Sequence, residues 1–328
     1  MTQSIKNLKA ESDPRIFKEV RDFLKILNSG GGKPIEQLSP ADARKVLVDA
    51  QNSVAVDCSG IEESEKTITQ DGEKVTIHIA KPVGSKSDTP VFVFIHGGGW
   101  VLGDYPTHRR LVRDLVVASR AVAVFPDYTP SPEARYPTAI NQIYATIKWV
   151  AEHGNEIGVN GKNLAVVGNS VGGNMTASVV LMAKEKNGPA IKLQVLLWPV
   201  TDANFETGSY LELGEGRFLT RNMMIWFWDS YLPDKTARKE IYASPLQASL
   251  EQLKGLPPAL IQTAENDILR DEGEAYARKL NEAGVPVMLT RQGGLIHDYG
   301  LLNPLANIPA VKTALLHAAA SIRKVLGS

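Results

Sequence analysis

"LAVVGNSVGGNMTASVVLMAKEK", residues 164–186, is the stretch that decides the fold. Four apolar residues lead into a glycine-rich turn, and a segment with a helical apolar pattern follows. The turn fits G-x-S-x-G, with Gly168, Ser170 and Gly172. In such a sharp turn, small neighbours let strand and helix pack closely, and the serine hydroxyl points up at the positive end of the helix dipole. The stretch therefore predicts a buried strand that presents a serine at the carboxyl edge of a sheet.

Short apolar runs on both sides of this stretch repeat the pattern. Continuous Val/Ile/Leu runs separated by helical stretches are typical of parallel strands covered on both faces. Earlier in the chain, residues 66–82 alternate around an Asp-Gly turn and are expected to form a hairpin. The predicted fold class is α/β, a doubly wound and mostly parallel sheet with helices on both faces. The expected strands cover residues 91–95, 121–128, 164–170, 193–200, 258–267 and 286–292.

Three predicted helices lie outside this alternation. Two precede the first strand signal, over residues 14–28 and 39–51, the second with Ser39 as its expected N-cap. The third, over residues 218–234 with Thr220 as its cap, is apolar on all sides, which indicates a buried helix or one beside a pocket. We expect these helices to cover the carboxyl edge of the sheet, where open α/β sheets bind ligands.

Composition excludes several classes of protein. The 328 residues carry 36 Lys and Arg against 36 Asp and Glu, so no basic field indicates nucleic acid or acidic lipid. The single cysteine, Cys58, allows no intrachain disulfide and suits a reducing compartment. The first fifteen residues are polar, unlike a signal peptide, and no run reaches the roughly 18–20 apolar residues of a membrane span. We interpret the chain as a cytoplasmic protein.

Ser170 needs a base within hydrogen-bond reach, because a serine hydroxyl is a poor nucleophile at neutral pH. In an α/β sheet of this kind, the acid and then the histidine follow the serine along the chain. Only His297 and His317 do so. His317 falls on an amphipathic final helix, whereas His297 lies in a loop after the last strand, at the carboxyl edge. The sequence therefore favours His297 as the base.

The acid is expected where the preceding strand ends. "TAENDILRDEG" offers several carboxylates, of which Asp267 sits at the end of the strand and Glu265 just before it. Asp271, Glu272 and Glu274 open the following helix, where carboxylates suit the helix dipole. Asp267 is the favoured acid and Glu265 the alternative. No cluster of His, Cys, Asp and Glu has metal-ligand spacing.

A second glycine cluster, "HGGGWVLGD" at residues 96–104, follows the strand at 91–95. A phosphate cradle would need G-x-x-x-x-G-K-[ST] or G-x-G-x-x-G before a helix, and neither is present. A serine hydrolase instead needs backbone N–H groups aimed at the oxyanion of a tetrahedral intermediate. Glycine lets the main chain come that close. The N–H of Val171, directly after the serine, is expected to be another donor, and His96 is expected to brace the loop.

Taken together, these motifs resemble the hormone-sensitive lipase family, the bacterial-type family IV carboxylesterases of the α/β-hydrolase fold. The resemblance spans nearly the whole chain, with the motifs in family order and spacing. It implies an eight-stranded sheet, a two-part helical cap, no cofactor and hydrolysis of short-acyl carboxylic esters. It also implies a division into N-terminal cap helices over residues 1–55, a core over 56–204, cap helices over 205–240 and the rest of the core over 241–328. The residues it implies are the triad Ser170, Asp267 and His297 and the oxyanion donors Gly98, Gly99 and Val171.

The chain departs from the family pattern beside the site. Asn169 replaces the usual aspartate before the nucleophile, and Val171 replaces alanine after it. Asp298 follows His297 in place of a small residue. These departures bear on substrate range rather than on the catalytic groups. Candidates for the substrate pocket are Asn169 and four aromatic residues for which a place in the cap core is an equal alternative: Trp226, Phe227, Trp228 and Tyr299.

Two other functions are weighed against a short-chain esterase. One is a hydrolase of lactones, carbamates, amides or acylated sugars on the same site, because bond choice depends on pocket shape. The other is a non-catalytic protein that binds small molecules, which the presence of His297 disfavours. The expected partner is a small-molecule ester, and the resemblance also suggests a homodimer through the last strand or the final helix.

Overall fold

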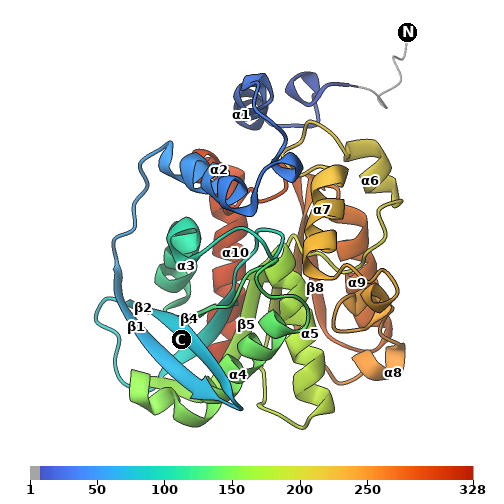
Figure 1. The fold of residues 1–328 in the computed structure, drawn as a ribbon. Coiled ribbons are helices and arrows are strands. Elements are labelled where there is room, and N and C mark those ends of the chain that lie inside the picture. Colours follow the sequence, from blue (N-terminus) through green and yellow to red (C-terminus); the bar gives the residue numbers. More distant parts are fainter. Residues whose placement is uncertain (1–7, 328) are drawn as a thin grey trace.

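The computed structural model describes residues 8–327. Within them, eight strands form one sheet in the order β1-β2-β4-β3-β5-β6-β7-β8 (Figure 1). The first two pairs in this order, β1 with β2 and β2 with β4, are antiparallel, and the other five pairs are parallel. The strands are β1 (Ile61–Gln70), β2 (Glu73–Pro82), β3 (Thr89–Ile95), β4 (Val122–Asp127), β5 (Val159–Asn169), β6 (Gln194–Leu197), β7 (Ala259–Asn266) and β8 (Val287–Ile296).

The strand predictions are confirmed. β1 and β2 form the expected hairpin around Asp71 and Gly72, with Gln70 opposite Glu73. Each of the six predicted parallel strands overlaps an observed strand. The mostly parallel, eight-stranded sheet of the expected α/β class is therefore present.

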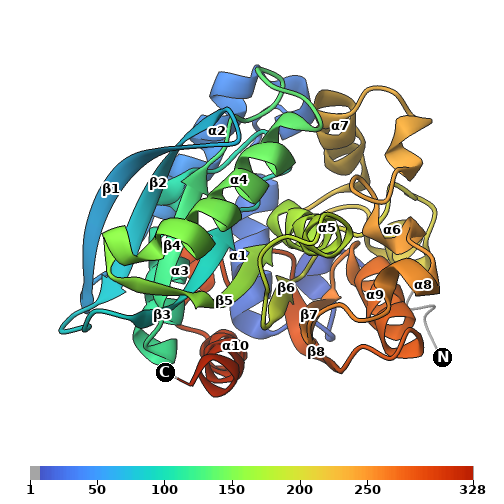
Figure 2. The ribbon, with the colours of Figure 1, turned by 90° about the horizontal axis from the view of Figure 1, so that it is seen from below.

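Alternation along β3 shows how the sheet separates two helical layers. Val91, Val93 and Ile95 belong to the cluster packed against α4 (Thr138–His153) and α5 (Val171–Glu185). Phe92 and Phe94 belong to the cluster packed against α3 (Tyr105–Ser119) and α10 (Pro309–Leu326). Figure 2 shows the two layers on opposite sides of the strands. Both faces of the central strands are buried, which explains their continuous apolar runs.

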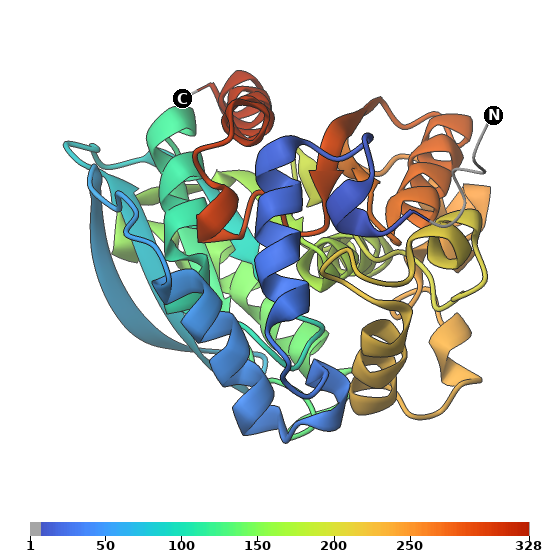
Figure 3. The same ribbon diagram turned by 90° about the horizontal axis from the view of Figure 1, so that it is seen from above.

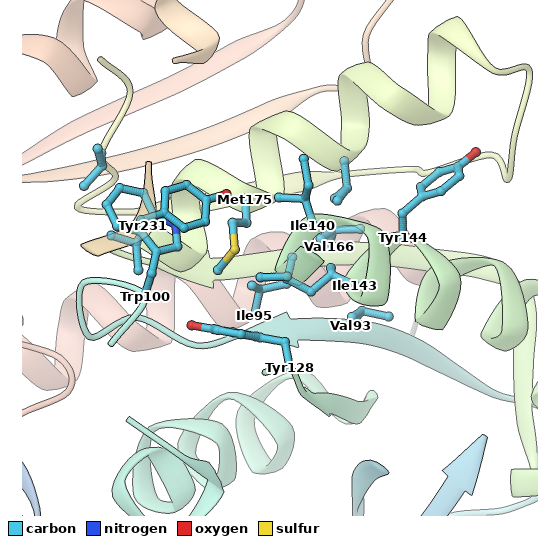
Figure 4. Packing of buried hydrophobic residues seen from close by; sticks show 14 of the residues in the cluster. Val93, Ile95, Trp100, Tyr128, Ile140, Ile143, Tyr144, Val166, Met175 and Tyr231 are labelled. Atoms are coloured by element: carbon cyan, nitrogen blue, oxygen red, sulfur yellow. The ribbon is translucent and has the colours of Figure 1, made fainter. Parts of the chain in front are cut away.

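The cluster on the α4 and α5 side is drawn in Figure 4. Ile140 and Ile143 of α4 and Met175 of α5 lie over Val93 and Val166 of the strands. A further helix on this face, α9 (Arg270–Glu282), packs with α5 through a smaller apolar cluster. The short α8 (Leu250–Leu253) adjoins it.

Four more helices lie above the carboxyl end of the sheet, where Figures 1 and 3 show them grouped. They are α1 (Lys18–Ser29), α2 (Pro40–Asn52), α6 (Gly208–Leu213) and α7 (Arg221–Tyr231). The predicted caps are observed: the side chain of Ser39 accepts from the N–H of Asp42, and that of Thr220 accepts from the N–H of Met223. The division into core and cap stays a prediction, and residues 1–7 and 328 of it lie outside the described residues.

Buried Asp13 ties the N-terminal segment to the loop between α6 and α7. Its carboxylate accepts from the guanidinium of Arg15 and from that of Arg217, each at 2.8 Å. Burial opposes ionisation, but these arginines outweigh it and hold the pKa of Asp13 at about 2. Segments separated by about two hundred residues are thus joined by a charged contact. None of the helices in residues 8–327 is both long enough and apolar enough to cross a bilayer.

Candidate active site

Ser170 occupies a strained turn between β5 and α5. Its backbone has φ 54° and ψ −121°, a conformation that L-residues rarely adopt. The turn is possible because its glycines lack side chains: a Cβ at Gly168 would lie 2.2 Å from the carbonyl oxygen of Gly172. A Cβ at Gly172 would lie 2.0 Å from the carbonyl oxygen of Ile95. The G-x-S-x-G pattern is thus a requirement of strand–helix packing at this turn.

The structure brings Ser170, His297 and Asp267 together from three segments. Nε2 of His297 lies 2.9 Å from Oγ of Ser170. Nδ1 of His297 lies 2.7 Å from Oδ2 of Asp267, and Oδ1 of Asp267 accepts from the N–H of Leu269 at 3.0 Å. Because Oδ2 accepts the Nδ1 proton, Nε2 of neutral His297 is free to take a proton from the serine.

All three side chains are buried; Ser170 is 4% exposed and His297 2%. Burial disfavours the imidazolium, but the carboxylates of Asp267 and Asp298 outweigh it and raise the pKa of His297. The histidine is therefore surrounded by groups that stabilise the positive charge it would gain as a base.

The other carboxylates near this loop have partners of their own. Oε2 of Glu265 accepts from the N–H of Gly294, on the neighbouring strand β8. Oδ2 of Asp271 accepts from the N–H of Ser209 at the start of α6. Buried Glu272 accepts from the N–H of Thr201, and burial raises its pKa well above the usual range. None of these contacts involves His297. Across the described part of the chain, no group of three His, Cys, Asp or Glu side chains is placed to hold a metal ion.

The glycine run passes directly over the serine. A Cβ at Gly97 would lie 3.0 Å from Cβ of Ser170. Gly98 and Gly99 have φ of 105° and 64°, so the loop needs glycine at both positions. Among the residues that the structure describes, neither N–H meets an acceptor. Val171 is the first residue of α5, where an N–H has no partner within the helix.

His96 braces this loop, as the sequence suggests. Nδ1 of His96 lies 2.8 Å from the carbonyl oxygen of Gly97, and the hydroxyl of Tyr128 donates to the carbonyl oxygen of His96. Burial lowers the pKa of His96 to about 4, so the ring is neutral and Nδ1–H is the donor.

Three of the aromatic candidates, Trp226, Phe227 and Trp228, lie on α7. The ring of Phe227 lies so close to the loop that a Cβ at Gly99 would be 2.1 Å from its Cδ1. Trp226 packs beside Phe227, and Trp228 stands edge-on to Trp100, which itself stacks on Tyr231 of α7 at 4.2 Å (Figure 4).

Two candidates lie elsewhere. Tyr299 is fully buried in the cluster beside α10, with its hydroxyl donating to Gln262. Asn169 is fully buried behind the serine, bound to the N–H of Gly97 and to Asp298. Both side chains are engaged in these contacts, and their assignment to the substrate pocket stays a prediction. Trp198 also belongs to the site although its sequence context did not predict this: its indole N–H donates to Asp298, and its only signal was a large aromatic residue directly after a buried strand.

Comparison with known proteins fits this geometry. Residues 92–301 match a family model described as the α/β hydrolase fold. The match spans more than half of the chain, and the chain therefore belongs to that family.

The relatives narrow the class further. A solved thermostable esterase from Pseudomonas putida is 63% identical, with a TM-score of 0.95 over 95% of this chain and 98% of that one. The carboxylesterase NlhH of Mycobacterium tuberculosis is 34% identical over 80% of this chain and 82% of its own length. The ethyl acetate hydrolase of Pseudomonas putida is 31% identical over 84% of this chain and 89% of its own length. The chain is a carboxylic ester hydrolase, and the resemblance to the hormone-sensitive lipase family is confirmed.

The contact between Phe227 and Gly99 can be tested with Gly99→Ala. The new methyl group must displace the ring, so we expect a loss of about 2–4 kcal/mol in the free energy of unfolding, together with reduced turnover. Gly255→Ala is the control, since Gly255 also has positive φ (75°) but nothing lies within 4 Å of its Cβ. It should lose only about 1 kcal/mol. Equal losses in denaturant titrations of the two variants would show that the ring does not constrain the loop.

Proposed function

We propose that the protein is a serine carboxylesterase that hydrolyses short-chain acyl esters through an acyl-enzyme intermediate. The observation that carries this proposal is the continuous hydrogen-bond chain from Oγ of Ser170 through His297 to Asp267, at 2.9 and 2.7 Å. The family and the esterase relatives support the reaction class.

The reaction follows from the placement of these groups. Ser170 attacks the ester carbonyl while Nε2 of His297 takes its proton. Asp267 holds the ring in the productive tautomer and stabilises the imidazolium. The alcohol leaves with the proton from His297, and a water molecule, activated by the same nitrogen, then releases the acid and restores the serine.

The negative charge of the tetrahedral intermediate needs donors beside the serine. We propose the N–H groups of Gly98, Gly99 and Val171. Support comes from the closeness of the glycine run to Ser170 and from the absence of any acceptor for Gly98 and Gly99 within residues 8–327. One such donor contributes roughly 10²–10³ in rate, because it is aimed at a charge that exists only during the reaction.

The position of Phe227 supports a preference for short acyl chains. Its ring packs on Gly99, one of the proposed donors, and so limits the space above the reacting carbonyl. Met223, one turn earlier on α7, lines a cavity of about 1000 Å³ between the N-terminal segment and α6. We propose this cavity as the approach for substrate. The name of the ethyl acetate hydrolase, a relative, is consistent with small acyl groups.

Other bonds of similar geometry remain alternatives: lactones, carbamates, amides and acylated sugars. A non-catalytic binding function is disfavoured, because His297 is hydrogen-bonded to both Ser170 and Asp267.

We further propose a cytoplasmic location and a homodimer through β8 or α10. A monomer in sedimentation experiments would exclude the homodimer.

Ser170→Ala tests the nucleophile. We expect hydrolysis of nitrophenyl butyrate to fall by at least about 10⁴-fold with the fold retained, because the acyl-enzyme can no longer form. A phosphonate probe should label the parent protein at Ser170 and leave the variant unlabelled in mass spectra. A variant that keeps most of its activity would show that another group attacks the ester.

Asp267→Asn tests the acid. The amide would hold His297 in the wrong tautomer, so kcat should fall by about 10⁴-fold. Asp271→Asn, in the first turn of α9, is the matched control and should keep nearly all of its activity, with a stability loss of about 1 kcal/mol from its contact with Ser209. If the Asp271 variant were the inactive one, the acid would have to be reassigned.

Phe227→Ala tests the acyl preference. Removing the ring should raise the kcat/KM ratio of nitrophenyl octanoate to nitrophenyl acetate by about 10-fold or more, since each methylene accommodated is worth about 1 kcal/mol or more. Ile26→Ala, on the exposed side of α1 and outside the lining of the cavity proposed for substrate approach, should leave the ratio unchanged. A ratio that does not move in the Phe227 variant would place the acyl group elsewhere.

A further inference from the structure

A buried network joins the histidine loop to the serine turn and the glycine run. Oδ1 of Asp298 accepts from Nε1 of Trp198 at 2.7 Å and from Nδ2 of Asn169 at 3.3 Å. Oδ1 of Asn169 accepts from the N–H of Gly97 at 3.0 Å. The other carboxylate oxygen of Asp298, Oδ2, lies 3.8 Å from Nε2 of His297.

The donors in this network fix where its charge lies. A backbone N–H can only donate, so the oxygen of the Asn169 amide must face Gly97 and its NH₂ must face Asp298. An indole N–H also can only donate. Oδ1 of Asp298 therefore accepts two hydrogen bonds and carries no proton itself.

Position 169 cannot carry a second charge in this arrangement. An aspartate there could still accept from Gly97, but its other oxygen would face Oδ1 of Asp298 at the 3.3 Å now spanned by a hydrogen bond. Two buried carboxylates at that separation cannot both be ionised. Asn169 and Asp298 thus form a pair that holds one negative charge, on the side of the histidine.

We propose that Asp298 is a positioning residue for the reaction, a second carboxylate that faces Nε2 of His297 while Asp267 holds Nδ1. This inference rests on the proposed role of His297 as general base. The charge of Asp298 stabilises the imidazolium from the side on which the proton is gained. Through Asn169, the same carboxylate fixes the glycine run over Ser170.

Backbone strain at three positions indicates that the surrounding structure holds this network in place. Trp198 and Asp298 both adopt positive φ, of 38° and 56°, as does Ser170 at 54°. Such conformations are costly for a tryptophan and persist only where the surroundings hold them. The hydrogen bond between Trp198 and Asp298 joins two of these strained positions.

The groups that face His297 are Asp267 from the end of β7, Ser170 from the serine turn and Asp298 from its own loop. Burial lowers the pKa of His297, and the two carboxylates raise it by more. Burial also raises the pKa of Asp298, against the opposing effects of His297, Trp198 and Asn169. The fall of kcat/KM at acid pH should therefore reflect the titration of His297 and Asp298 as a coupled pair.

Asp298→Asn removes the charge and keeps the shape, since its Oδ1 can still accept from Trp198 and Asn169. We expect the acid limb of kcat/KM for nitrophenyl butyrate to move to lower pH, because His297 loses a neighbour that favours its protonated form. Asp22→Asn, the same charge change on the exposed face of α1, should leave the limb in place. An unmoved limb in the Asp298 variant would overturn the electrostatic role.

Asn169→Asp tests the one-charge pair by a double-mutant cycle. Alone, it should lower Tm by roughly 5–10 °C, because it forces a second carboxylate into the network. In the Asp298→Asn background, the same change should lower Tm by less than half as much. Additive shifts would mean that the two positions do not share a charge.

Phosphonate labelling of the parent protein separates this inference from the proposed function. If the proposed function is wrong, the parent protein will not be labelled at Ser170. If the parent is labelled and yet the acid limb stays in place and the Tm shifts are additive, then only the role of Asp298 is wrong.

Discussion

The close approach of β5, α5 and the end of β3 around Ser170 is the constraint on which the rest of the site depends. Gly168 and Gly172 leave about 2 Å between a missing Cβ and the nearest backbone oxygen, so no side chain fits there. The strained serine is held by the buried sheet and by backbone hydrogen bonds to Leu197, which ends β6, and to Val200 in the loop after it. Every other part of the site, from the histidine loop to the glycine run, is arranged around a serine whose position is fixed by packing.

Much of the fold could be predicted from local pattern. The strands followed from apolar runs, the hairpin from Asp71-Gly72, and the starts of α2 and α7 from Ser39 and Thr220, because these signals act within a few residues. Ser170, Asp267 and His297 could be singled out because parallel strands deliver their carboxyl ends to one edge. Their proximity is observed, while their roles and the division into core and cap stay predictions.

Contacts between distant segments could not be predicted. Tyr299 follows the histidine by two residues, yet its hydroxyl turns to Gln262 in the core. Asn169 and Asp298 each looked like a separate departure from the family pattern, and only the folded chain brings their side chains together. Trp198 stood out only as a large aromatic residue after a buried strand, because its indole acquires a partner only when the end of β6 and the histidine loop meet. The direction of a side chain in a loop depends on tertiary packing. A few neighbouring residues of one sequence do not show that packing.

The aromatic contacts between α7 and the glycine run connect two properties that an enzyme engineer would prefer to vary separately. Phe227 rests on Gly99, and Tyr231 stacks on Trp100, so the helix proposed to bound the space for substrate also steadies the backbone beside the serine. Any reshaping of this helix for a bulkier substrate also alters the rigidity of that backbone. Breadth of specificity and catalytic rate are therefore expected to trade against each other in variants of this protein, and paired substitutions on α7 and residues 97–100 offer the way to relax that link.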